Sequence, residues 1–179
     1  MTREVLFVLG LQGVGKSTYI RSIVNDSPMF SVVVIDYEEL RKQVLELYPD
    51  PDVLHPQYDA SSYYVLLAAD LLRTWLETPG DDPEIIIVEC TGMTKQNQAS
   101  LRFMADQATK YDAEYRFIYL KIVDEEAYKE AIEGNEAAFN MFKAWKYGGP
   151  KWCEPNKNLL LDHVEVVEID HNKWLDQPF

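Results

Sequence analysis

One segment, GLQGVGKS at positions 10–17, constrains the fold of this chain more than any other feature. It matches the pattern G-x-x-x-x-G-K-[S/T], whose fixed positions are Gly10, Gly15, Lys16 and Ser17. A short apolar run at 5–9 precedes it and a helical pattern follows it, so its context is strand, loop and helix. Because glycine adopts backbone angles that a Cβ would block, successive N–H groups can turn toward one anion. Residues 10–17 are therefore predicted to bind phosphate, and we call them the phosphate loop.

The parts of the phosphate loop have distinct expected roles toward a nucleoside triphosphate. Lys16 can reach the β- and γ-phosphates, and the Ser17 hydroxyl can ligate Mg²⁺. The nucleotide would be held by the loop and the start of the next helix, at Gly10, Gly13, Val14, Gly15, Lys16, Ser17 and Thr18. The sequence lacks the N-K-x-D segment with which GTPases bind guanine, so we expect ATP with Mg²⁺.

Apolar runs rich in β-formers alternate with helical patterns along the rest of the chain. Strands are predicted at 5–9, 31–35, 84–88, 115–123 and 164–169. Helices are predicted at 17–24, 38–47, 58–76, 95–111 and 124–145, the last with a break at Gly134. Proline and glycine predict loops at 49–56, 79–83 and 147–158. This alternation predicts one α/β domain over 1–179, with a three-layer P-loop NTPase fold and a mostly parallel five-stranded sheet.

Acidic residues come at the ends of two predicted strands. Parallel strands end at one edge of a sheet, so Gly10, Asp36 and Glu89 should meet there. Glu89 is expected to help hold Mg²⁺, and the alternative is a carboxylate that caps the next helix. Asp36 or Glu38 could accept the proton of an attacking hydroxyl, with Arg41 binding a substrate phosphate or the carboxylate. The alternative for Glu38 is an ordinary ion pair with Arg41 on the helix surface.

Three segments, GLQGVGKST, VVVID-YEELR and IIIVECTGM, resemble the small P-loop kinases of the phage polynucleotide kinase group, which are allied to zeta-toxin-like kinases. The resemblance covers residues 5–123. In that family an acid followed three residues later by arginine supplies the catalytic base, which implies Glu38 with Arg41; Asp36 offers a competing register. Where the family has aspartate after the third strand, this chain has Glu89.

The family's lid helix carries arginines that clamp the migrating phosphoryl group, whereas the corresponding AYKEAIEGNEAAF has none. Within a lid or substrate segment at 124–158, lysines and aromatic residues could replace that clamp, with only Glu154 opposing them in the sequence. We expect substrate contacts from Lys143, Trp145, Lys146 and Trp152. The alternative is an ordinary loop whose tryptophans pack on the core.

Composition narrows the function classes. A net charge of −13, from 17 basic and 30 acidic residues, opposes non-specific binding to nucleic acid but permits a local cationic pocket. No apolar run reaches the length of a membrane helix, and two cysteines are too few for a disulfide framework, so a cytoplasmic location is expected, the host cytoplasm if phage-encoded. The expected function is transfer of the ATP γ-phosphoryl group to a hydroxyl of a nucleoside, nucleotide or nucleic-acid end, a modified base in phage DNA included. The alternative is a regulatory ATPase without an acceptor, and the oligomeric state stays open.

Overall fold

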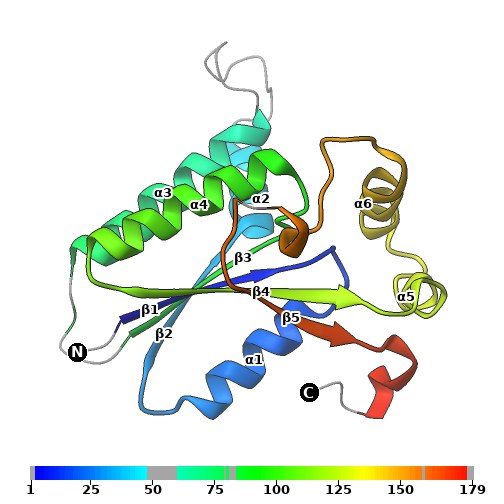
Figure 1. Cartoon of the computed structure of the whole chain (residues 1–179), viewed down its shortest axis with the longest axis horizontal. Helices are drawn as coiled ribbons and strands as arrows, with labels where there is room; N and C mark the ends of the chain where they lie inside the picture. The colour runs from blue at the N-terminus through cyan, green and yellow to red at the C-terminus, as the bar shows by residue number, and fades with distance from the viewer. Residues whose placement is uncertain (1–2, 48–59, 79, 81–83, 159, 177–179) are drawn as a thin grey trace.

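The computed structural model describes residues 3–47, 60–78, 80, 84–158 and 160–176, and its centre is one five-stranded sheet (Figure 1). All described strand pairs are parallel, in the order β2-β3-β1-β4-β5. The strands are β1 Arg3–Leu9, β2 Ser31–Asp36, β3 Glu84–Cys90, β4 Glu114–Ile122 and β5 Val164–Ile169. The predicted three-layer α/β fold is confirmed.

Helices cover both faces of the sheet. The helices are α1 Lys16–Asp26, α2 Tyr37–Leu47, α3 Ala60–Glu77, α4 Lys95–Lys110, α5 Glu125–Ala131 and α6 Glu136–Tyr147, with short 3₁₀ turns η2 Pro155–Lys157 and η3 His171–Asp176. Helices α3 and α4 lie on one face and α1 lies on the other, while α5 and α6 lie beyond the carboxyl end of β4 (Figure 1). Among the helices described, none is both long and apolar enough to pass through a bilayer.

Strand β1 lies at the centre of the sheet, and its residues from Val5 to Leu9 are apolar and buried on both faces. Phe7 joins the core beneath α2, α3 and α4 and stacks on Phe117 of β4, with ring centroids 4.9 Å apart. Its neighbour Val8 joins the core formed with α1, α5 and α6. Both side chains are fully buried, as expected of a strand between two layers of helices.

The predicted helix over 124–145 is interrupted at the position where glycine suggested a break. Gly134 adopts a φ of 80° between α5 and α6. The Asn135 side chain then caps α6 by accepting a hydrogen bond from the Ala138 N–H at 3.1 Å. The predicted loop at 49–56, the first two residues of the helix predicted from 58, and most of the turn at 79–83 lie outside the described residues.

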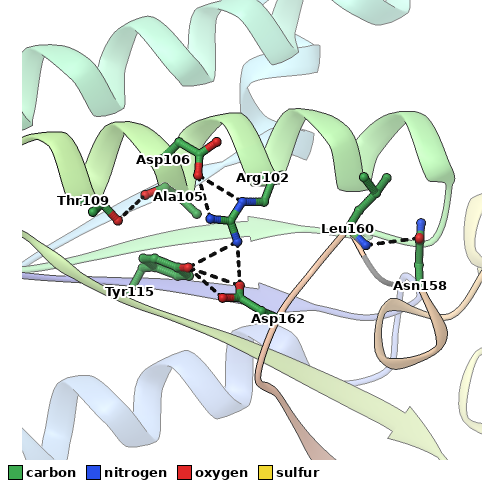
Figure 2. Close-up of polar contacts among 8 residues, drawn as sticks. All are labelled: Arg102, Ala105, Asp106, Thr109, Tyr115, Asn158, Leu160 and Asp162. Carbon is green, nitrogen blue, oxygen red and sulfur yellow. Dashed lines mark hydrogen bonds and ion pairs between the residues drawn. The ribbon is translucent and has the colours of Figure 1, made fainter.

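Arg102 on α4 fixes the chain where it returns to the sheet (Figure 2). Its guanidinium contacts Asp106 on the same helix at 2.6 Å and Asp162, just before β5, at 2.7 Å. The Tyr115 hydroxyl of β4 donates to the same Asp162 carboxylate. These contacts attach the segment that follows α6 to both α4 and β4.

Candidate active site

The carboxyl ends of β1, β2 and β3 bring the predicted loop and acids together. Asp36 at the end of β2 is opposite Glu89 in β3, and Glu89 is opposite Val8 in β1. The Gly10 N–H donates to the Thr91 carbonyl at 3.0 Å, which joins the start of the phosphate loop to the chain leaving β3. The predicted convergence at this edge is therefore present.

The phosphate loop depends on glycine at two positions. Gly13 adopts a φ of 79°, and a Cβ there would lie 2.7 Å from Cγ2 of Ile132, next to α5. Gly15 has a φ of 114° and is the N-terminal cap of α1. A side chain at either position would meet backbone strain, and at Gly13 also a steric clash.

The amino end of α1 is prepared for an anion. Its first turn carries no acidic residue, and the Gly15 cap offers no side-chain hydrogen bond. The first hydrogen bond of the helix runs from the Tyr19 N–H to the Gly15 carbonyl at 3.0 Å, so the preceding N–H groups have no partner within the helix. These N–H groups and the helix dipole together favour phosphate.

Lys16 folds back over the phosphate loop. Its ammonium Nζ donates to the carbonyls of Gly10 at 2.8 Å and Leu11 at 3.1 Å. Burial lowers the pKa of Lys16 from its ordinary value, and the nearby carboxylates, Glu89 foremost, oppose that shift. Lys16 is thus held at the loop by carbonyl oxygens that a phosphate oxygen could replace.

Ser17 and Glu89 lie near each other and together resemble half of a magnesium site. Ser17 lies in the first turn of α1, and Glu89 is the next-to-last residue of β3. Burial raises the pKa of Glu89, while Lys16 and the nearby Ser17 hydroxyl act in the opposite direction. The described residues contain no group of three or more histidine, cysteine or acidic side chains fit to hold a metal alone. A hydroxyl beside one carboxylate fits Mg²⁺, which takes its other ligands from phosphate and water.

The two candidate bases occupy different positions at the start of α2. One carboxylate oxygen of Asp36 accepts hydrogen bonds from the N–H groups of Glu38 at 2.9 Å and Glu39 at 3.3 Å, so Asp36 caps α2. Glu38 lies 3.5 Å from Arg41, and the two side chains are 45% and 51% exposed. Both carboxylates are near enough to Lys16 to act on its pKa, so neither is excluded by position.

Helix α5 supports the phosphate loop through a residue that sequence reasoning missed. The hydroxyl of Tyr128, which is fully buried, donates to the Gln12 carbonyl at 2.5 Å. The imidazole of His171 in η3 packs on the other side, with ring centroids 5.3 Å apart. The only signal in the sequence was an aromatic residue at an apolar helix position, which describes a core residue equally well.

The lysine and aromatic residues of α6 and the following loop are largely engaged within the protein. Lys146 pairs with Glu125 of α5 at 2.5 Å, so Glu154 is not the only acid that opposes these cations. Trp145 and Trp152 are partly buried and pack against the core on the α1 face. Lys143 is exposed, with Nζ 4.9 Å from the centre of the Phe139 ring. The packing of the tryptophans agrees with the alternative in which they serve the core.

Comparison with known proteins yields no match to a family model and no match among curated proteins. Solved structures do match. An APS kinase of Mycobacterium tuberculosis, solved with AMPPNP and APS, is 10% identical, with 98% of this chain and 95% of that chain covered and a TM-score of 0.56. A gluconokinase of Sinorhizobium meliloti is 12% identical, with coverages of 92% and 82% and a TM-score of 0.56. A fungal RNA kinase is 13% identical, with coverages of 95% and 75% and a TM-score of 0.51. At these identities the likeness is one of fold: this chain shares the three-layer α/β fold of these kinases.

Proposed function

We propose that this protein is an ATP-dependent kinase that transfers the γ-phosphoryl group to a hydroxyl group. The observation that carries the proposal is that Lys16, Ser17 and Glu89 lie together at the amino end of α1, whose Gly15 cap offers no side-chain hydrogen bond. These groups supply anion-binding N–H donors, a cation for the phosphates and two oxygen ligands for Mg²⁺ in one place. The P-loop kinase fold gives independent support.

Each residue would have a separate task when ATP is bound. Lys16 would leave the carbonyls of Gly10 and Leu11 and turn to the β- and γ-phosphates. Ser17 and Glu89 would hold Mg²⁺, which offsets phosphate charge when bound. Asp36 or Glu38 would take the proton of the attacking hydroxyl as its oxygen bonds to phosphorus and the bond to the ADP oxygen breaks.

The acceptor class that we propose is the one that the resemblance implies. We propose a hydroxyl of a nucleoside, a nucleotide or a nucleic-acid end, with a modified base in phage DNA inside the same class. The fold likeness to an APS kinase and an RNA kinase supports this class. Residues 124–158 would form a lid over the reacting groups, and the exposed Lys143 would offer a cation to the substrate there.

A regulatory ATPase is the second candidate, and the arrangement of arginines favours it. Residues 124–158 contain no arginine. The five arginines that form ion pairs among the described residues are Arg3, Arg41, Arg73, Arg102 and Arg116. The remaining one, Arg21, donates to the Ser17 carbonyl at 3.4 Å. A clamp on the migrating phosphoryl group would therefore need lysine, Arg21, or an arginine released from its carboxylate.

The deciding experiment is incubation with γ-labelled ATP and Mg²⁺ in the presence of nucleosides, nucleotides and oligonucleotides with free 5′-hydroxyl ends. We expect labelled acceptor with the wild-type protein and none with Lys16→Ala, while Ser17→Ala should lose the magnesium-dependent rate. Lys110→Ala, at an exposed lysine of α4, is the matched control and should behave as wild type. Label released only as inorganic phosphate would favour the regulatory ATPase, and turnover that survives in Lys16→Ala would contradict both candidates.

A further inference from the structure

Gln98 on α4 is fully buried although its side chain is polar. Its amide Nε2 donates to two carbonyl oxygens, that of Gly92 at 2.8 Å and that of Cys153 at 2.7 Å. Its Oε1 accepts a hydrogen bond from the Asn158 side chain at 2.5 Å. Both donors and the acceptor of the amide are therefore used, each toward a different segment of the chain.

The first of these segments belongs to the candidate active site. Gly92 lies three positions after Glu89 and has a φ of 62°. The chain passes close to Leu9 at this point, because a Cβ on residue 92 would lie 3.0 Å from the Leu9 side chain. The preceding residue, Thr91, accepts the hydrogen bond from Gly10 that begins the phosphate loop. The carbonyl that Gln98 holds is thus fixed closely to both the phosphate loop and the acid of β3.

The second segment is 148–154, which follows α6 and carries Trp152. It runs beside the chain that leaves β3: the Lys95 N–H donates to the Lys151 carbonyl at 3.0 Å and the Cys153 N–H to the Met93 carbonyl at 2.9 Å. Trp152 itself pairs with Thr94 across this contact. Gln98 lies beneath the contact and is the one described side chain that hydrogen-bonds to both segments.

We propose that Gln98 is a positioning residue for the phosphoryl-transfer reaction, which locks residues 148–154 against the exit of β3. This inference rests on the proposed function. Gln98 touches neither nucleotide nor acceptor; it acts through Gly92 and Cys153. Through these two contacts it sets the distance between the carboxyl end of β3, which carries Glu89, and residues 148–154, which carry Trp152. An apolar residue would fill the same space but leave two carbonyls and an amide without partners, so the two segments could separate.

The test compares Gln98→Leu with Gln96→Leu, a matched change at an exposed position of the same helix. Hydrogen exchange of the Lys95 and Cys153 amides reports the lock directly and requires no acceptor. We expect exchange at both amides to become about tenfold faster in Gln98→Leu and to stay unchanged in the control. Affinity for a fluorescent ATP analogue should change less than about twofold, while transfer to the best acceptor of the panel falls about tenfold. A residue that only stabilised the fold would not separate these two quantities.

If Gln98→Leu does not fold, Gln98→Met gives the same test, because its unbranched side chain nearly keeps the shape of glutamine and still removes the donations to Gly92 and Cys153. Unchanged exchange at Lys95 and Cys153 would overturn the lock, whatever the activity. Faster exchange with unchanged transfer would overturn the positioning role. A wild-type protein that labels no acceptor would contradict the proposed function, and with it the role of Gln98 in phosphoryl transfer. The hydrogen-exchange data would then still test whether Gln98 holds residues 148–154 against the exit of β3.

Discussion

Replacing Tyr128 with phenylalanine would remove one hydroxyl from the buried contact between α5 and the phosphate loop. The ring would keep its packing, and the change would leave the Gln12 carbonyl without its 2.5 Å donor. Burial raises the pKa of this phenol, so in the wild-type protein it stays a neutral donor at all ordinary pH values.

The cost follows from the hydrogen bond that is lost. A buried acceptor that loses its neutral donor costs about 1–3 kcal/mol, and we expect the lower half of that range because the carbonyl is at the edge of the core. In a chain of this size, 1.5 kcal/mol corresponds to a fall in Tm of about 3–6 °C. The phosphate loop would lose its fixed conformation in the free protein, so ATP affinity should fall by up to about tenfold.

The assay combines urea unfolding with titration of a fluorescent ATP analogue. Tyr119→Phe is the control, because Tyr119 is also a buried phenol whose hydroxyl donates, at 2.9 Å, but to Glu154 rather than to the phosphate loop. We expect both variants to lose stability and only Tyr128→Phe to lose ATP affinity. Equal affinities in the two variants would refute the idea that α5 supports the loop through this hydroxyl.

Three further predictions concern the acids and the lysines. One of the two changes Asp36→Asn and Glu38→Gln, but not both, should lower the rate of phosphoryl transfer about 10²–10⁴-fold at unchanged ATP affinity. Wild-type rates in both variants would show that neither residue is the catalytic base. Burial raises the pKa of Glu89 above its ordinary 4.5, so stability is lost as the pH rises through the raised value. Glu89→Gln should therefore resist urea better than wild type at pH 7 and equally at about pH 4, below the ordinary carboxyl pKa, and a variant less stable at pH 7 would contradict the sign. The double change Lys143→Ala with Lys146→Ala should raise the acceptor KM, more strongly at low salt, and unchanged kinetics would assign these lysines to the protein surface alone.

The strands and the phosphate loop were predictable because their signals are local. Apolar runs gave every strand to within two residues at its ends, and Gly134 gave the break between α5 and α6. The meeting of Asp36 and Glu89 also followed from sequence, since in a parallel sheet the acids that end adjacent strands share an edge. These inferences need only the residue pattern within each segment and the rule that parallel strands end at the same edge of a sheet.

The supporting contacts were not predictable because their signals are not local. Tyr128 lies 116 positions from the carbonyl it holds, and Gln98 lies 60 positions from Asn158. Nothing in a single sequence distinguishes these residues from other tyrosines and glutamines on helices. The pairing of Lys146 with Glu125 was missed for a related reason, because it requires knowing how α5 and α6 pack together.

The central place of β1 has a consequence for how the protein is made. The strand leaves the ribosome before its partners β3 and β4, which begin only at Glu84 and Glu114. At translation rates of about 5–20 residues per second, a strand that is apolar from Val5 to Leu9 waits several seconds before either partner emerges. The phosphate loop, although it is encoded near the start of this chain, can acquire its shape only when Thr91 and α5 are present. Nucleotide binding should therefore appear only after α5 has emerged, and nascent chains that end before β4 should depend on chaperones to keep β1 from aggregating.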